Sequence, residues 1–271
     1  MIVVSDLDGT LLDSRHALSP RNRSTLNALG ERGVVRVVAT GRSLYSARQV
    51  LDDDFPIDYL VFSSGAGVVE WPTKSLILVR DMILEDALSI AEVLMQRSLD
   101  FMLHHGVPDS HRFYYFSVSG SNPDFDARCE RYGDFAQPWP DQPPPLERVS
   151  QLLAIEPFDA PSQFEALDQA LERQRVILTT SPLDKSSRWI EIFPQTVSKA
   201  IASAWICTEL GLDNQRVLAV GNDFNDKDLL DWASSARVVA NAPEELKRRY
   251  TAVRSNDDDG FSEAVDQWLK C

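Results

Sequence analysis

The chain has 271 residues, of which 44% are hydrophobic and 25% charged, enough to bury one large core or two smaller ones. Its formal net charge of −14 disfavours contact with nucleic acid or an anionic membrane, so we expect neither as a partner. The start lacks a basic segment ahead of an apolar stretch, no apolar run approaches a membrane span, and the cysteines show no CxxC spacing. We therefore expect a cytoplasmic protein with reduced thiols.

Short β-branched runs that are apolar at consecutive positions occur towards both ends of the chain, with helical stretches between them. Such runs are typical of strands covered on both faces. Helices are predicted over residues 19–33, from a serine N-cap followed by proline, over 197–211 and over 242–249. Strands that alternate with helices predict an α/β fold with a Rossmann-like, doubly wound parallel sheet. The predicted strands are Ile2–Ser5, Val34–Ala39, Tyr59–Phe62, Val217–Val220 and Val238–Ala240.

The middle of the chain has strands that are richer in aromatic residues and closer together in sequence. This pattern predicts an antiparallel α+β unit of a common domain size, inserted into the parallel domain. We expect the inserted domain to cover residues 82–187 and the discontinuous core domain to cover 1–81 and 188–271. In this middle part of the chain, helices are predicted over 84–97, 124–132 and 161–173, and strands within 101–106, 112–120, 150–157 and 175–181. A further strand, 189–194, falls just beyond the expected boundary.

Two aspartates, Asp6 and Asp8, stand directly after the first predicted strand, in the stretch DLDGTLL. Ligands of open α/β sheets bind beyond the carboxyl ends of the strands, where both carboxylates would lie. Neighbouring carboxylates repel unless a cation lies between them, and their oxygen atoms suit Mg²⁺. One of them can then attack phosphorus and form an aspartyl-phosphate, while Gly9 lets the backbone bend close to the ligand. Taken alone, the stretch would rather indicate a solvated turn after a strand.

Three further polar stretches follow in order along the chain. Thr40 ends the second predicted strand in VVATGR and offers a hydroxyl to a phosphate oxygen, although a lone threonine there is usually a turn-capping residue. Lys199 begins a helix in VSKAIA, where the helix dipole disfavours a cation unless an anion lies nearby. The loop GNDFNDKDLL follows a buried strand and would by itself most often be solvated. Its polar residues are Asn222, Asp223, Asn225 and Asp226.

In this order, the stretches resemble the motifs of the haloacid dehalogenase-like hydrolase superfamily, in its Cof-type branch (subfamily IIB). The resemblance covers the whole chain: DLDGTLL comes first, then ATGR, SSGAG, IEIFP with the SK pair, GNDFNDKDLL and VVANAPEELK. It implies a Rossmann-like core with a C2-type cap inserted after the third core strand. It also implies an enzyme that hydrolyses phosphoric monoesters with Mg²⁺ as its cofactor.

The resemblance also assigns roles to individual residues. Asp6 would be the nucleophile and a side-chain ligand of Mg²⁺. Asp8 would be the general acid and then the base that activates water, and its backbone carbonyl would bind the metal. Thr40 and Lys199 would hold the phosphoryl oxygens and complete the catalytic set. The expected substrate-binding residues are Thr40, Gly41, Arg42, Ser64, Gly65, Lys199 and Asn225. For Arg42, a structural pairing is the alternative role.

Two positions depart from the pattern of the family. The last motif commonly has a metal-binding aspartate after its glycine, whereas this chain has Asn222, which carries no charge and should weaken Mg²⁺ binding. We expect Asn222 and Asp226 to contact the metal, with Asp223 as the alternative to Asn222. The second departure is Ser64 in SSGAG, where this branch usually has asparagine, so Ser64 would reach the substrate over a shorter distance.

The leading prediction is a Mg²⁺-dependent phosphatase for a small phosphorylated metabolite, a sugar or polyol phosphate, acting as a monomer or weak homodimer. The alternatives are a specialised phosphatase for a sugar-phosphoglycerate or sucrose-phosphate-like ester, a phosphomutase, and a non-catalytic ligand-binding protein of the same fold.

In this family the cap selects the substrate. His104 and His105 are adjacent on a predicted strand, so their side chains would point to opposite faces of that strand. The unranked candidates on the cap are His104, His105, Arg112 and Lys185.

Overall fold

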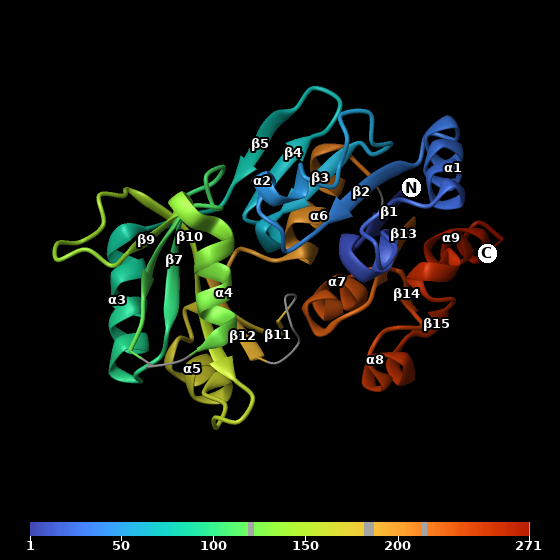
Figure 1. Ribbon diagram of the computed structural model, residues 1–271. Coiled ribbons are helices and arrows are strands. Elements are labelled where there is room, and N and C mark those ends of the chain that lie inside the picture. Colours follow the sequence, from blue (N-terminus) through green and yellow to red (C-terminus); the bar gives the residue numbers. More distant parts are fainter. Residues whose placement is uncertain (119–121, 182–186, 213–215, 271) are drawn as a thin grey trace. The chain divides into compact units, whose positions relative to one another are not determined.

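The computed structural model describes residues 1–118, 122–181, 187–212 and 216–270. The chain divides into two compact units (Figure 1). The core unit comprises residues 1–42, 46–79 and 198–271, and the inserted unit comprises 43–45 and 80–197. Within the described residues, no helix is long and apolar enough to cross a bilayer.

The core unit is built on one eight-stranded sheet. Strands β15 to β3 of the pairing order run parallel, whereas β4 and β5 add an antiparallel edge. The sequence did not predict this edge or the short strand β15. In pairing order the strands are β15 (Thr251–Val253), β14 (Ser235–Val239), β13 (Val217–Gly221), β1 (Ile2–Ser5), β2 (Val35–Ala39), β3 (Tyr59–Phe62), β4 (Gly67–Glu70) and β5 (Ser75–Val79).

Helices cover both faces of the parallel part of the core sheet, which makes the sheet doubly wound. On one face, α6 (Lys199–Glu209) and α7 (Lys227–Trp232) pack on apolar side chains of the central strands, together with α8 (Glu244–Arg249). The helices α1 (Pro20–Glu31) and α9 (Gly260–Trp268) lie side by side, α1 against β2 and α9 against β13 (Figure 1). The predicted fold class is therefore confirmed.

The inserted unit has its own seven-stranded, mainly antiparallel sheet. The helices α3 (Leu84–Gln96) and α5 (Phe164–Ala170) share an apolar core with one of its faces, and α4 (Pro123–Tyr132) packs on the other. The short helix α2 (Leu44–Ala47) begins in residues 43–45, which belong to the inserted unit, and ends in residues of the core unit. The strands are β6 (Met82–Ile83), β7 (Phe101–His105), β8 (Phe113–Phe116), β9 (Ala136–Pro138), β10 (Arg148–Pro157), β11 (Gln174–Thr180) and β12 (Ser187–Pro194).

The second boundary of the inserted unit differs from the predicted one at Arg188. Strand β12 begins at Ser187 and pairs with both β10 and β11 as far as Pro194, so it belongs to the sheet of the inserted unit. The chain returns to the core unit only at Ser198. The apolar run WIEIFP is therefore explained by the inserted sheet.

Candidate functional site

The carboxyl ends of four neighbouring strands bring the predicted motifs to one edge of the core sheet. Strand β1 pairs with β13 on one side and β2 on the other, and β2 pairs with β3. The residues that follow these strands are therefore close neighbours. The next residues after β1, β2, β3 and β13 are Asp6, Thr40, Ser63 and Asn222.

Asp6 is held at this edge by its backbone and by its side chain. Its amide donates to the Val220 carbonyl at 2.9 Å, which continues the pairing of β1 with β13. The chain then turns sharply through Gly9, whose φ of 70° favours glycine. The turn brings the Thr10 hydroxyl to Asp6 Oδ2 at 3.2 Å. The Asp6 side chain is thereby aimed beyond the end of its strand, and the residue is only 6% exposed.

Lys199 reaches Asp6 from the first turn of α6. Its Nζ lies 2.7 Å from Asp6 Oδ1 and 2.6 Å from Asp226 Oδ1. Ser198 caps this helix by accepting the Ile201 amide at 3.0 Å. The ion pairs explain how a cation can occupy the end of a helix whose dipole opposes it, because two buried carboxylates surround the ammonium group.

Three buried charges at this point leave one negative charge uncompensated. Burial and the nearby Asp226 carboxylate raise the pKa of Asp6 to about 7, although the Lys199 ammonium lowers it. The pKa of Lys199 is raised, because the carboxylates of Asp226 and Asp6 outweigh the effect of burial. The lysine therefore stays charged, and the two acids share one counter-charge.

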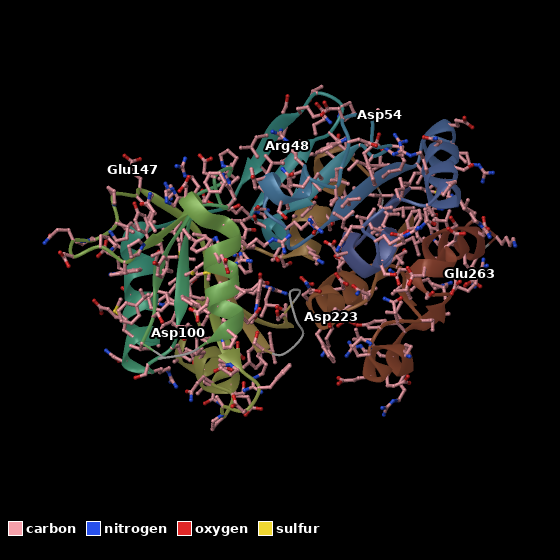
Figure 2. The ribbon with its side chains drawn as sticks, viewed as in Figure 1. Arg48, Asp54, Asp100, Glu147, Asp223 and Glu263 are labelled. Atoms are coloured by element: carbon pink, nitrogen blue, oxygen red, sulfur yellow. The ribbon has the colours of Figure 1, made fainter. Side chains whose placement is uncertain are left out.

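Asp226 organises the loop after β13. Its second oxygen accepts the backbone N–H groups of Asn222 at 2.9 Å and of Asp223 at 3.2 Å. Asp223 caps the following turn by accepting the Phe224 amide, and Figure 2 labels it on the loop ahead of α7. Asp226 is fully buried, so it fixes both the lysine and the loop.

Asp8 forms an ion pair with Arg42, for which the sequence left structural pairing open without naming the partner. The Arg42 guanidinium contacts it with two nitrogens, Nε to Oδ2 at 2.7 Å and Nη2 to Oδ1 at 2.6 Å. His16 Nδ1 lies 3.2 Å from the same Oδ1. A contact between Arg42 and the substrate would therefore compete with this bidentate ion pair, which fixes the orientation of the Asp8 carboxylate.

The remaining expected substrate residues line the ends of β2 and β3. The Thr40 hydroxyl accepts the Arg42 amide at 3.1 Å. Ser64 has a buried hydroxyl with no hydrogen-bond partner among the described residues, and a Cβ on Gly41 would lie 3.6 Å from it. Gly65 has a φ of 107°, and a Cβ there would overlap the Ser198 carbonyl. The close approach of Gly65 therefore positions the first turn of α6.

The site also contains Asn225 and three contacts to the turn after β1 that the sequence did not predict. Asn225 lies in the 3-10 turn Phe224–Asp226 and is partly buried. Besides Thr10 and His16, Asn241 donates to the Gly9 carbonyl at 2.8 Å. The threonine of DLDGT could have been singled out from its place beside Asp6, whereas the other two contacts depend on how distant loops fold back.

The oxygen atoms around Asp6 fit a hard divalent cation. Asp6 and Asp226 supply carboxylates with excess negative charge, and a Cβ on Gly9 would lie 2.7 Å from the Asn222 amide, which indicates how closely that side chain approaches the turn. In the described ranges, no three His, Cys, Asp or Glu side chains gather as a metal site. Amide and backbone oxygens, such as those of Asn222 and Asp8, would therefore have to complete the coordination, and Mg²⁺ accepts both.

The candidates in the inserted unit fall on different faces. His104 is buried, and its Nδ1 lies 2.7 Å from the Ser110 carbonyl. His105 points to the opposite face of β7 and stacks on Tyr114, with ring centroids 5.5 Å apart. Arg112 lies over the Phe135 ring at 5.7 Å. Lys185 lies outside the described residues.

Comparison with known proteins identifies the family. A model of the haloacid dehalogenase-like hydrolases matches residues 3–265, so the chain belongs to this family. A 5-amino-6-(5-phospho-D-ribitylamino)uracil phosphatase of Bacillus subtilis is 24% identical over 289 residues, covering 98% of this chain and 97% of that protein. These findings confirm the predicted family and the predicted class of enzyme, a phosphatase.

Solved structures with low sequence identity share the fold. A phosphatase of the superfamily from Bacteroides thetaiotaomicron superposes with a TM-score of 0.79 at 18% identity, covering 100% of this chain and 95% of that one. A subclass IIB sugar phosphatase superposes with a TM-score of 0.75 at 16% identity, covering 100% and 99%. Both cover the core and the inserted unit.

Proposed function

We propose that this chain is a Mg²⁺-dependent phosphatase that hydrolyses a sugar phosphate or polyol phosphate through an aspartyl-phosphate on Asp6. The observation that carries the proposal is the buried group in which the Lys199 ammonium lies between Asp6 and Asp226. A buried carboxylate beside a fixed cation, at the ligand-binding edge of the sheet, is suited to receive a phosphoryl group.

The reaction has two steps. The Asp6 oxygen that does not pair with Lys199, Oδ2, attacks phosphorus, and the ester oxygen leaves as the alcohol, which takes its proton from Asp8. Asp8 then takes a proton from a water molecule that attacks the same phosphorus, which regenerates Asp6 and releases inorganic phosphate. Arg42 must release one oxygen of Asp8 for these proton transfers, because both oxygens are engaged.

Lys199, Thr40 and Ser64 hold the phosphoryl oxygens. Lys199 also offsets negative charge around Asp6, and the unpartnered Ser64 hydroxyl is available to donate to an oxygen. Asp6, Asn222 and Asp226, with the Asp8 carbonyl, would hold Mg²⁺, which neutralises phosphate charge when bound. Asp223 is the alternative to Asn222.

The substrate class is supported by the names of similar proteins. The relative from Bacillus subtilis is named for a substrate with a phosphorylated ribityl chain, and a solved neighbour is named a sugar phosphatase. A cytoplasmic location and a monomeric or weakly dimeric state stay predictions from the sequence.

A panel of phosphate esters tests the proposal. Phosphate release should require Mg²⁺, stop on chelation, and disappear in Asp6→Asn, which keeps the size of the side chain but removes the nucleophile. Asp266→Asn is the matched control, because Asp266 is an exposed residue in a surface ion pair with Arg21. Hydrolysis by Asp6→Asn at the wild-type rate would refute the assignment of the nucleophile, and no turnover of any ester would favour a binding protein.

A further inference from the structure

The turn after β1 (Leu7–Leu11) is held from outside by the loops that follow β14 and β15. Strand β13 pairs with β1, β14 with β13 and β15 with β14, all in parallel, so these strands end at the same edge of the core sheet. Asn241 follows β14, and Asn256 follows β15. Both asparagines therefore lie beside the turn that carries Asp8.

The side chain of Asn241 joins this turn to the loop after β15. Its Nδ2 donates to the Gly9 carbonyl at 2.8 Å, and its Oδ1 accepts the Asn256 backbone amide at 3.1 Å. A carbonyl only accepts and a backbone N–H only donates, so the two partners fix which way the side-chain amide points. Although Asn241 is an exposed residue, both ends of its amide are engaged.

Asn256 anchors this link in the interior of the core unit. The residue is only 6% exposed, and its Nδ2 donates to the Leu12 carbonyl at 3.0 Å. The Leu12 amide donates to the Leu7 carbonyl at 3.0 Å, which closes the turn. The pair of asparagines therefore holds the turn at its middle, Gly9, and at its end, Leu12.

The peptide that Asn241 holds joins Gly9 to Thr10, directly after Asp8. Gly9 has a φ of 70°, and glycine adopts more backbone conformations than any other residue, so the turn alone defines the direction of Asp8 loosely. The Asp8 carboxylate is held by Arg42, but Arg42 must release one of its oxygens during proton transfer. A contact to the backbone is kept in that step.

We propose that Asn241 is a positioning residue for Asp8: by fixing the Gly9 carbonyl against Asn256, it keeps the Asp8 carboxylate where it protonates the leaving alcohol. The inference rests on the proposed phosphatase function, in which Asp8 is the general acid. Loss of the Asn241 amide should misplace Asp8 without removing a reacting group. A misplacement of about 1 Å can lower a rate by about 100-fold.

Two esters with different leaving groups test this role. An alkyl alcohol needs a proton to leave, whereas para-nitrophenolate is a stable anion that leaves without one. The ratio kcat/KM reports the attack of Asp6 and the departure of the leaving group. Asn241→Ala should lower kcat/KM by about 10–100-fold for the alkyl ester that the wild type hydrolyses best, with a loss about tenfold smaller for para-nitrophenyl phosphate.

Asn241→Asp separates the two contacts of this side chain. It keeps an oxygen that accepts the Asn256 amide and loses the donor to the Gly9 carbonyl. We therefore expect it to lower the ratio of the two kcat/KM values, alkyl over nitrophenyl, as much as Asn241→Ala does. Asn27→Ala is the matched control, because Asn27 is an exposed asparagine on α1 of the same unit, and it should leave this ratio unchanged.

Combination with Asp8→Asn tests whether Asn241 acts through Asp8. Asp8→Asn has already lost the proton donor, so adding Asn241→Ala should change the single-turnover release of the alkyl alcohol by less than about twofold. A loss of the same factor in the wild-type and Asp8→Asn backgrounds would show that the two residues act independently, which overturns the inference.

The remaining outcomes separate this inference from the proposed function. Equal losses on both esters in Asn241→Ala show that the residue supports Asp6 or the fold as a whole, which refutes the role through Asp8. A wild-type ratio in Asn241→Asp shows that the Gly9 contact is dispensable, which also refutes it. Both results leave the phosphatase proposal standing if turnover still needs Asp6, whereas turnover that survives Asp6→Asn removes the proposal and the inference together.

Discussion

Replacing Lys199 by methionine tests how much the ammonium group contributes to the stability of the fold and to catalysis. Methionine keeps much of the length of the side chain but removes the ammonium group, which is 2.7 Å from Asp6 and 2.6 Å from Asp226. Both carboxylates are buried, so the variant leaves them facing each other without a counter-charge. Removing one partner of a buried ion pair costs about 3–5 kcal/mol of unfolding free energy.

The loss should depend on pH in a defined direction. Asp6 has a folded-state pKa of about 7 against an unfolded value of 3.8, so its contribution to stability is present below pH 3.8 and is lost as the pH rises to 7. Without the ammonium group the pKa rises further. Lys199→Met should therefore be destabilised more at pH 8 than at pH 5, where the carboxylates can take up protons.

Urea unfolding without Mg²⁺, at both pH values, measures this loss, and phosphate release measures the effect on catalysis. We expect kcat to fall by about 100-fold or more, as when a fixed charge partner of the reacting group is removed. Lys247→Met is the control, because Lys247 lies at the surface, where it pairs with the exposed Glu244 and donates to the Ala240 carbonyl, so its loss should affect stability little. A loss of stability in Lys199→Met no larger than in this control, or independent of pH, would refute the reasoning.

Two further predictions concern the backbone behind the site and the inserted unit. Gly65→Ala should unfold more easily by about 2 kcal/mol or more and lower kcat, because its Cβ would overlap the Ser198 carbonyl; Gly33→Ala, also at positive φ but in open space, should cost about 1 kcal/mol. His104 has a pKa lowered to about 3, so its stabilising effect is complete above pH 6.5 and is lost as the pH falls. The wild type should lose about 2 kcal/mol more than His104→Phe between pH 7 and pH 5, measured by urea unfolding; equal losses would contradict the buried neutral ring.

The strand-end motifs could be predicted because their geometry is local to a parallel sheet. Asp6 follows β1 and Asn222 follows β13, and the pairing of these strands brings the two loops together. The structure also brings Lys199 to Asp6, although no sequence rule fixes the direction of a lysine side chain. The catalytic and metal-binding roles of these residues stay predictions.

Other features depend on long-range packing that the sequence does not encode locally. The ion pair between Arg42 and Asp8 forms because the turn after β2 lies beside the turn after β1. The pairing of His104 with Gln151 depends on the register of β7 against β10, which includes an irregularity near Gln151. The C-terminal helix α9 was not predicted, although its buried apolar residues Phe261, Ala264, Val265 and Trp268 follow a helical spacing.

The most direct test of the central claim is recovery of the phosphoryl group on Asp6. The enzyme is mixed with a labelled phosphate ester and Mg²⁺, quenched in acid within one turnover, and mapped by peptide mass spectrometry. The account predicts label on the peptide that contains Asp6, more of it in Asp8→Asn, where hydrolysis of the intermediate lacks its base, and none in Asp6→Asn. Steady release of phosphate without any label on that peptide in either the wild type or Asp8→Asn would contradict it.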